Sequence, residues 1–513
     1  MQYADALRYL DEHSSYERTG RVDSPSTKNI EILLDAIANP QHSYRSIHIT
    51  GTNGKGSTAQ IITKLLMAHG LRVGTYSSPH INRINDRICI NGEPIDDTEF
   101  GLQIGAIADL EILSAIRPSF FEIMTAAMFR WFADEAVDVA VVEVGMLGRW
   151  DATNVIDSDV AVITNIALDH MEYAGPTVEH IAKEKAGIIK SSSALILGET
   201  DELLREIFLN EPARSQLIRD EDFACEDNFL AIGGRMITVR TPRSKYEDIL
   251  LPLHGQHQGD NASLAICAVE AFFDDSINRD VLDEAMSMVA MPGRFEVLGH
   301  RPLVIIDGAH NPAGAKVCAE VFFEDFNTQG RKIIVMGALR SRNPEDLLVA
   351  LRANEFDVVI TCMPPTPRGL PADEMAAVAQ SIGCADVRVA DSVEKACELA
   401  MKIAQDEIFG PVACLIPFRD EAHAIELAND IQYGLSSYVW TENIGRAHRV
   451  AAAVEAGMCF VNSQNVRDLR QPFGGTKASG TGREGGTWSY EVFCEPKNVA
   501  VSMGSHHIPH WGV

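Results

Sequence analysis

The sequence predicts an α/β fold, with a parallel sheet covered by helices, then a second α/β block and a shorter α/β tail. Apolar runs at residues 137–144 and 160–166 are typical of strands buried on both faces. They alternate with helical patterns, as parallel sheets require. In addition, a strand at residues 47–50 leads through a glycine-rich turn into a helix at residues 57–69, which Gly70 ends.

A second block is expected behind the first. Between residues 200 and 254 the pattern is less regular and more polar, and a long helix follows at residues 261–273. A Met-Pro-Gly-Arg stretch at residues 291–294 marks a boundary, so the first domain is expected over residues 1–291 and the second over residues 292–405. Strands of the second domain are expected at residues 303–306, 333–336, 358–361 and 387–389, with a last helix at residues 392–404.

Composition and charge exclude several classes of protein for this sequence. The 513 residues include 44 Lys and Arg against 72 Asp and Glu, a net charge of −28. Such a charge repels nucleic acid and anionic membranes, so neither is an expected partner. The first residues are polar and acidic rather than a secretory signal, and no apolar run reaches membrane-spanning length. The ten cysteines stand singly, which indicates free thiols in a reducing compartment, and we expect a cytoplasmic protein.

The glycine-rich turn is the first candidate site. Glycines let backbone N–H groups turn toward a phosphate, and the N-terminus of the following helix adds a positive dipole. Lys55 can reach the β- and γ-phosphates and Ser57 can meet magnesium, although Gly56 separates the two. The alternative is an ordinary glycine-rich turn, which a lone glycine pattern would favour. The candidate nucleotide-binding residues are Thr52, Asn53, Gly54, Lys55, Gly56, Ser57 and Thr58.

Two further strand ends offer metal ligands, because ligands of parallel sheets bind at the carboxyl ends of the strands. Glu143 closes one apolar run, and His170 lies just beyond another, after Asp169. Each alone has a structural explanation, as a cap or as a surface histidine. Beside a phosphate-binding lysine they favour magnesium. The charged run at residues 183–185 is, by residue type alone, a solvated face.

At these residues the sequence resembles the folylpolyglutamate synthase/dihydrofolate synthase family of the Mur ligase superfamily, over roughly residues 1–405. The matching motifs are HITGTNGKGST (48–58), YSSPHINRINDRI (76–88), SFFEIMTAAMF (119–129), VVEVGMLGRWDATN (141–154), LDHMEYAG (168–175), EKAGIIK (184–190), HGQHQGDNA (254–262), MPGRFE (291–296) and DGAHNP (307–312). The resemblance implies a Mur-ligase-like central domain with a P-loop and a parallel sheet, followed by a Rossmann-like α/β domain.

The resemblance also implies roles for single residues. Lys55 would bind the transferring phosphate, Lys185 would be carbamylated and support the metal site, and His310 would lie near the incoming glutamate. Magnesium would be bound by Ser57, Ser78, Glu143 and His170, the last of which would also act in catalysis. ATP would be held in addition by Asn261, Arg294 and Asp307. The pterin pocket would be lined by Phe120, Phe121, Glu122, Arg149 and Asp151.

The implied reaction is ATP-dependent amide formation by a monomeric ligase part. ATP converts a carboxylate of a folate or dihydropteroate into an acyl phosphate, the amine of L-glutamate attacks, and phosphate leaves. Catalysis is then mainly charge neutralisation by magnesium and Lys55, plus positioning, with domain closure as the expected gate. Two alternatives remain. One is a Mur-type ligase with another acceptor, and the other is a catalytically weak fusion that acts in binding or assembly.

The pattern changes at about residue 406. Residues 406–513 resemble the C-terminal end of an aldehyde dehydrogenase, most closely of the 5-carboxymethyl-2-hydroxymuconate semialdehyde type, in EIFGP (407–411), YGLSSYVWT (433–441) and PFGGTKASGTGREGG (472–486). In that family Glu407 and Phe409 would touch NAD, but the nucleotide domain and the cysteine nucleophile that should precede them are ligase sequence here. The tail's own cysteines stand in other motif contexts: Cys414, Cys459 and Cys494. We expect no dehydrogenase activity and consider the tail a candidate for association.

The junction allows a prediction about folding. The family's last strand sequence is replaced, yet residues 412–416 are apolar and β-prone. Residues 411–417 are therefore expected either to pair into the second ligase domain or to start a separate small unit, with further strands at residues 436–440 and 459–462. The separate unit is favoured, because the tail offers its own partner strands. It lacks most of its original core and should be the least stable part of the chain.

Overall fold

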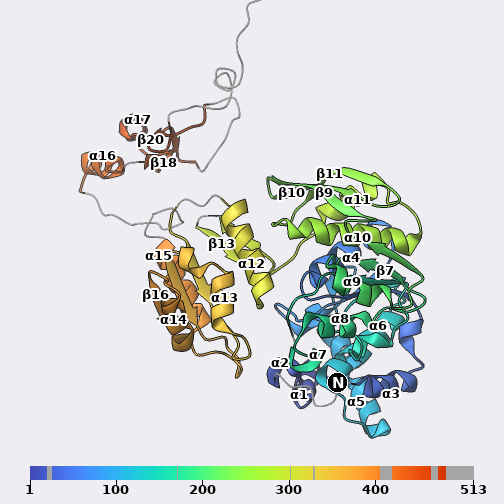
Figure 1. The fold of residues 1–513 in the computed structure, drawn as a ribbon. Helices are drawn as coiled ribbons and strands as arrows, with labels where there is room; N and C mark the ends of the chain where they lie inside the picture. The colour runs from blue at the N-terminus through green and yellow to red at the C-terminus, as the bar shows by residue number, and fades with distance from the viewer. Residues whose placement is uncertain are drawn as a thin grey trace, which may run out of the picture. The chain divides into compact units, whose positions relative to one another are not determined.

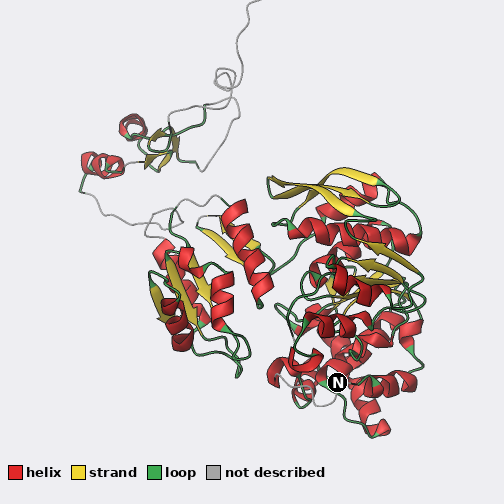
Figure 2. Cartoon of the chain, viewed as in Figure 1, coloured by secondary structure: helices red, strands yellow, loops and turns green. Residues whose placement is uncertain are grey.

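The computed structural model describes residues 1–19, 26–169, 171–300, 302–326, 330–404, 419–431, 433–463 and 472–480. The chain forms two compact units, Met1–Gly410 and Pro411–Val513. Helices and strands alternate through the chain, which confirms the α/β class (Figures 1 and 2). In the described ranges, no helix combines the length and the apolar character that crossing a membrane requires.

The larger unit begins with an eight-stranded sheet. Its strands are β1 (Arg45–Thr50), β2 (Val73–Tyr76), β3 (Ile88–Ile90), β4 (Glu93–Pro94), β5 (Val139–Glu143), β6 (Val160–Ile163), β7 (Ala194–Leu197) and β8 (Ser215–Ile218), in the order β4-β3-β2-β5-β1-β6-β7-β8. Neighbours from β2 to β8 along this order run parallel, and β3 and β4 add an antiparallel edge. The strands predicted from the apolar runs are confirmed, with shorter bounds for β5 and β6.

Helices cover both faces of this sheet (Figure 1). They are α1 (Tyr3–Asp11), α2 (Tyr16–Thr19), α3 (Lys28–Ala36), η1 (Pro40–His42), α4 (Lys55–Ala68), η2 (Ile84–Arg87), α5 (Asp97–Ser114), α6 (Phe120–Asp134), η3 (Ala152–Val155), α7 (Met171–Ala174), α8 (Val178–Ala186), α9 (Glu202–Leu209), α10 (His257–Phe273) and α11 (Arg279–Ser287).

Side chains that alternate along a strand point to opposite faces of a sheet. Val141 of β5 belongs to the core beneath α4 and α10, whereas its neighbours Ala140 and Val142 belong to the core beneath α5 and α6. Side chains of β6 and β7 meet α8 and α9 on that second side. Because both faces are buried, these strands are apolar throughout, which is why their positions were predictable.

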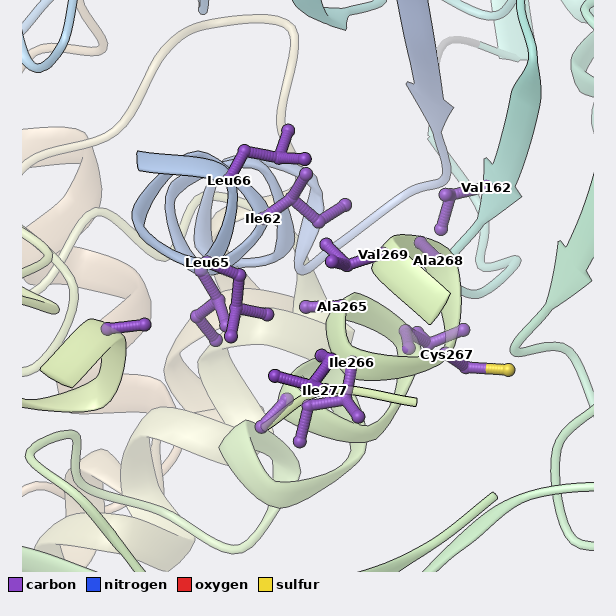
Figure 3. Close-up of a cluster of buried hydrophobic side chains, with 14 of the residues drawn as sticks. Ile62, Leu65, Leu66, Val162, Ala265, Ile266, Cys267, Ala268, Val269 and Ile277 are labelled. Carbon is purple, nitrogen blue, oxygen red and sulfur yellow. The ribbon is translucent and has the colours of Figure 1, made fainter. Parts of the chain in front are cut away.

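Helix α4 is held in place by α10 (Figure 3). Ile62, Leu65 and Leu66 of α4 lie against Ala265 and Val269 of α10, and all five side chains are fully buried. The small Ala265 side chain lets the two helices approach closely. Since α4 starts at the glycine-rich turn, this apolar contact fixes the position of the turn on the sheet.

Residues 200–254, where the sequence pattern is less regular and more polar, contain a second sheet that the pattern did not indicate. After α9 and β8, three strands form an antiparallel sheet in the order β11-β10-β9, namely β9 (Ala224–Ala231), β10 (Gly234–Arg240) and β11 (Lys245–Leu251). Ile237, Val239 and Ile249 join the core shared with α10, while many of the alternating residues are polar and exposed. Only one face of this sheet is apolar, so its strands lack the continuous apolar runs that mark the parallel sheet.

The second block contains the predicted strands, divided between two sheets. Residues 303–306 form β13 (Leu303–Ile306), which pairs antiparallel with β12 (Glu296–His300), a strand that the sequence pattern did not indicate. The parallel sheet has the order β14-β15-β16, with β14 (Ile333–Met336), β15 (Val358–Cys362) and β16 (Val387–Ala390). The helical elements are α12 (Pro312–Glu320), η4 (Val321–Asp325), α13 (Pro344–Ala350), η5 (Ala353–Glu355), α14 (Ala372–Ser381) and α15 (Val393–Ala404).

The smaller unit has its own βαβ core. It contains α16 (Glu421–Asn429), β17 (Tyr433–Gly434), β18 (Ser436–Val439), α17 (Ile444–Ala453), β19 (Met458–Val461) and β20 (Thr476–Lys477). β18 and β19 pair in parallel, and β17 pairs antiparallel with β20. The two predicted tail strands are thus confirmed. Tyr438 and Trp440 are 47% and 62% exposed. Residues 411–417, and with them Glu407, Phe409, Cys414 and Cys494, lie outside the described residues.

Leu65→Ala should test the contact that fixes α4. Leu65 is fully buried, so the substitution removes apolar contacts and leaves a cavity. We expect the free energy of unfolding to fall by about 2–5 kcal/mol. Leu113→Ala is the matched control, because the Leu113 side chain is 80% exposed and its loss should change stability by less than about 0.5 kcal/mol. Urea unfolding followed by circular dichroism measures both, and equal effects would contradict the role of the α4–α10 contact.

Candidate active site

The glycine-rich turn lies in a space that only glycine backbone fits. Gly54 has φ +83°, and a Cβ there would stand 2.4 Å from Oδ1 of Asn261 on α10. Gly51 has φ +150°, and a Cβ there would stand 1.8 Å from the Thr164 hydroxyl beyond β6. The turn is therefore clamped between α10 and the end of β6. Its backbone N–H groups lead into the N-terminus of α4, an arrangement that binds phosphate.

The side chains of the turn anchor it further. The Asn53 N–H donates to Oδ1 of Asn165 at 3.0 Å, and the Ala167 N–H donates to the Thr52 hydroxyl at 2.9 Å. Lys55 Nζ donates to the Gly51 and Thr52 carbonyls, both at 3.2 Å. A carboxylate or phosphate oxygen would be a stronger partner for this ammonium than two neutral carbonyls.

Glu143 lies beside the backbone of two segments that carry candidate metal ligands. Its carboxylate is buried at the end of β5, the Ser78 N–H lies 3.4 Å from Oε2, and a Cβ on Gly56 would stand 3.7 Å from the same oxygen. The turn residue before Ser57 therefore faces Glu143. Burial raises the pKa of Glu143, and nearby Lys55 acts in the opposite direction.

These oxygen ligands fit a magnesium ion. A carboxylate whose charge is disfavoured by burial gains most from a bound cation, and carboxylate and hydroxyl oxygens are the ligands magnesium prefers. Among the described residues no three His, Cys, Asp or Glu side chains cluster into an all-protein metal site. Magnesium beside a nucleotide keeps waters and phosphate oxygens as ligands, so it does not need such a cluster. His170 lies outside the described residues.

The interpretation of residues 183–185 as a solvated face is wrong for Lys185. This side chain, near the end of α8, is 4% exposed, and its Nζ donates to the Gly51 carbonyl at 2.7 Å. Burial lowers the pKa of Lys185 well below its usual range, and the nearby Lys55 lowers it further. Lys55 and Lys185 line one small enclosed pocket together with Asp169. The side of α8 that carries Lys185 faces the sheet, which a charge run cannot reveal.

Asp151 is a buried organiser of the loop after β5. Its Oδ2 accepts from the Met146 N–H at 2.8 Å, and its Oδ1 accepts from the Thr153 N–H at 2.9 Å and the Thr153 hydroxyl at 2.6 Å. The Thr153 hydroxyl oxygen also lies 2.9 Å from Nε2 of His48 in β1. Because the hydroxyl donates to Asp151, it accepts from His48. Burial lowers the pKa of His48 to about 3, so His48 is neutral and carries its proton on Nε2.

The other residues predicted for the pterin pocket are spread along two elements. Phe120 and Phe121 begin α6, where the Arg87 guanidinium lies 5.3 Å from the Phe120 ring centre and Phe121 packs on Tyr76. Glu122 accepts from the Ser119 N–H at 2.7 Å and so caps this helix. Arg149 instead contacts the Lys183 carbonyl and the Glu211 carboxylate, both at 3.0 Å.

The second block brings its own polar residues to the turn. Nδ2 of Asn311 donates to Oδ1 of Asn53 at 3.1 Å. Asp307 accepts from the Phe295 N–H at 2.8 Å and the Ala309 N–H at 2.7 Å, so its carboxylate shapes two loops. His310 is 54% exposed on its side chain. Arg294 lies beside one of these loops, since a Cβ on Gly308 would stand 3.1 Å from its Nη1.

Several residues of the site carry no sequence signal that pattern reasoning could use. His48 is a common residue type inside a predicted strand, Thr153 lies between two predicted strands, and Asn311 is one polar residue among several in its loop. Arg342 of the second block donates to Asp169 at 2.7 Å from a polar loop before α13. What unites them is position in the folded chain. Only the register of β1 and the docking of the second block place them at the turn.

Comparisons with known proteins show the family of the chain. Residues 49–269 match the Mur ligase middle domain, residues 293–410 the Mur ligase glutamate ligase domain, and residues 387–499 the aldehyde dehydrogenase family. The chain is similar to the dihydrofolate synthase/folylpolyglutamate synthase of Mycobacterium tuberculosis, with 37% identity over 419 residues that cover 76% of this chain and 85% of the relative. The chain belongs to the dihydrofolate synthase/folylpolyglutamate synthase family.

Solved structures of this family superpose on the chain. The Mycobacterium tuberculosis folylpolyglutamate synthase complexed with ADP and AMPPCP matches with a TM-score of 0.74 and 37% identity, over 80% of this chain and 93% of that chain. A bifunctional folylpolyglutamate synthase/dihydrofolate synthase with Mn, AMPPNP and L-glutamate bound matches with a TM-score of 0.68 and 26% identity, over 78% and 92%. The Mur-ligase-like fold is thus confirmed. The narrower aldehyde dehydrogenase type of the tail stays a prediction.

Thr153→Val should show what the His48–Thr153–Asp151 network does. Valine keeps the shape of threonine but leaves the His48 N–H and one Asp151 oxygen without their buried hydroxyl partner. We expect the free energy of unfolding to fall by about 1–3 kcal/mol and nucleotide affinity to fall with it, because the loop after β5 lines the Lys55 pocket. Thr153→Ser keeps the hydroxyl and is the control. Nucleotide affinity is measured by calorimetry. Equal affinity in all three proteins would show that the network does not contribute to nucleotide binding.

Proposed function

We propose that this chain is an ATP-dependent ligase that joins a carboxylate of a folate or dihydropteroate to the amine of L-glutamate. The observation that carries the proposal is the clamped glycine turn, which opens α4 beside Lys55, the buried Glu143 and the buried Lys185. The similar proteins support it, since they are named dihydrofolate and folylpolyglutamate synthases and include complexes with ADP, nucleotide analogues, Mn and L-glutamate.

The chemistry overcomes the low reactivity of a carboxylate as an acyl donor. A carboxylate oxygen attacks the γ-phosphorus of ATP, ADP leaves, and the product is an acyl phosphate with a good leaving group. The glutamate amine then attacks the acyl carbon, the C–O bond to phosphate breaks, and the amine loses a proton to solvent as the amide forms. Both steps move negative charge along phosphate oxygens. Lys55 and the N–H groups at the start of α4 would neutralise that charge.

Magnesium would be held by Ser57, Ser78 and Glu143, together with His170. When bound, it supplies further charge neutralisation at the β- and γ-phosphates. Thr52, Asn53, Gly54, Gly56 and Thr58 would cradle the phosphates, and Asn261 would approach the nucleotide from α10. Arg294 and Asp307 would complete the nucleotide site from the second block.

The substrate sites would lie on either side of the turn. Phe120 and Phe121 offer aromatic surface at the start of α6, which suits a flat pterin ring. Asp151 and Glu122 shape the neighbouring loop and helix through backbone N–H groups, so we assign them to positioning of the pocket. His310, whose Nε2 lies 3.8 Å from the Asp169 carboxylate, would stand near the glutamate amine. The ligase part would act as a monomer.

One turnover assay tests the function. Purified full-length protein is given ATP and magnesium with dihydropteroate or with tetrahydrofolate, each with and without L-glutamate, and phosphate release and the amide product are measured. We expect release to require both a folate-type acceptor and glutamate. Release with neither acceptor, or with a cell-wall precursor in their place, would contradict the proposal.

Lys55→Ala should abolish this turnover. The ammonium is the side-chain cation at the phosphate end of the turn, and its loss removes charge neutralisation in both steps. We expect kcat to fall by at least about 10²-fold while the melting temperature stays close to that of the parent. Lys64→Ala, one lysine later on the same helix, is the control and should keep full turnover. Comparable turnover in the Lys55 and Lys64 variants would remove the phosphate-binding role.

We also propose that Lys185 carries a carbamate. Only a neutral amine adds to carbon dioxide, and burial next to Lys55 favours the neutral form of Lys185. Intact mass measurement at high bicarbonate should show a gain of about 44 Da that Lys185→Arg lacks, since arginine stays protonated in proteins. Active enzyme with an unmodified Lys185 and no bicarbonate dependence of turnover would overturn this assignment.

A further inference from the structure

One ion pair joins the second block to the phosphate pocket. Arg342 lies in the loop between β14 and α13, and its Nη1 donates to Oδ1 of Asp169 at 2.7 Å. The Arg342 side chain is 22% exposed and that of Asp169 is 7% exposed. Asp169 belongs to the first block, beyond the end of β6. The pair therefore exists only when the two blocks are docked.

The negative charge of Asp169 would disfavour phosphate binding nearby. Its carboxylate lines the same small pocket as Lys55 and Lys185. A buried carboxylate repels phosphate oxygens and weakens the neutralisation that Lys55 supplies, because charges interact strongly where water is scarce. Pairing with a guanidinium offsets this repulsion. Without Arg342, the buried Asp169 would lose its charged partner from the second block, beside the reacting groups.

His310 approaches the same carboxylate from the same block. Its Nε2 lies 3.8 Å from Oδ2 of Asp169, while Arg342 holds Oδ1. Two residues of the second block, Arg342 and the histidine proposed to stand near glutamate, thus lie beside different oxygens of the same carboxylate. Fixing one end of a carboxylate in this way also fixes where its second oxygen points.

Other contacts between the blocks have a different character. Arg368 donates to the Tyr16 and Glu17 carbonyls at 3.0 and 2.9 Å, and Asn311 meets Asn53 through two neutral amides. Arg235 of β10 pairs with Asp325 of η4 at 2.9 Å, a buried pair whose residues do not line the phosphate pocket. Among these described contacts, Arg342 is the one that neutralises a carboxylate of the pocket.

We propose that Arg342 is a positioning residue of the ligase reaction, which neutralises Asp169 and sets His310 against the phosphate pocket when the second block docks. This inference rests on the proposed function. The loop that carries Arg342 would offset the negative charge of Asp169 in the first block's pocket and so favour phosphate there. Both chemical steps would then run only when the two blocks are docked.

Kinetics of variants test the proposal in the full-length enzyme. Arg342→Ala should lower kcat by about 10²-fold with little change in the KM for ATP, since the pocket is misarranged rather than lost. Arg342→Lys keeps the charge and should recover part of the rate. Arg352→Ala is the matched control, because Arg352 is an arginine of the same block that pairs locally with Glu355 at 2.6 Å. Wild-type kcat in Arg342→Ala would overturn the proposal.

A double variant separates neutralisation from other roles of Arg342. If its task is to cancel the charge of Asp169, adding Asp169→Asn to Arg342→Ala should restore part of the lost rate, although Asp169→Asn alone slows the enzyme. No recovery would overturn the neutralising role. A rise confined to the KM for glutamate, with kcat unchanged, would make Arg342 a direct substrate contact and would also overturn the proposal.

Hydrogen exchange gives a readout that does not depend on turnover. Amides of residues 166–169 and 308–311 should exchange faster in Arg342→Ala than in the parent, and Arg352→Ala should leave both segments unchanged. If the parent lacks ligase activity but this difference is present, the proposed function fails while the pairing of the blocks stands. Equal exchange in Arg342→Ala and the parent would overturn the inference, whatever the activity.

Discussion

The site depends on one steric constraint, the passage of the glycine turn between α10 and the end of β6. A Cβ at Gly51 or Gly54 would stand within 2.5 Å of Thr164 or Asn261, and both glycines have a positive φ that other residues rarely adopt. Because the turn lies so deep, its carbonyl at Gly51 meets the buried Lys185, and Lys55 shares a pocket with that side chain. The burial that lowers the pKa of Lys185 and the approach of Asn311 both depend on this close fit.

Much of the fold was predictable because the parallel sheet is buried on both faces. Its strands are continuous apolar runs, and the turn after β1 combines glycines with a lysine. Both patterns can be recognised in the sequence without knowledge of the fold. The antiparallel strands β9 to β11 and the strand β12 were not predictable in this way. One polar face, or a glycine in the strand, erases the apolar run on which the prediction depends.

The site shows the same division. Lys55 and Glu143 could be found from residue type and from their place at strand ends. The buried state of Lys185 could not, because it depends on which side of α8 faces the sheet. Carboxylates attract attention as ligands, yet Glu122, Asp151 and Asp307 each accept backbone N–H groups here. Their residue type indicates a polar site, and only the folded chain shows that they hold the loops and the helix around it.

The last helix of the second block lies where two families meet. Residues 387–410 match both the glutamate ligase domain and the aldehyde dehydrogenase family, and they contain β16 and α15. A strand followed by a helix is common among α/β proteins, and α15 packs on β14 to β16 through Ala396 and Ile403. A join inside such a shared βα unit keeps β16 and α15 in the ligase domain while the downstream sequence changes. The unit of β16 and α15 is thereby a position at which the sequences of two unrelated enzymes can be joined.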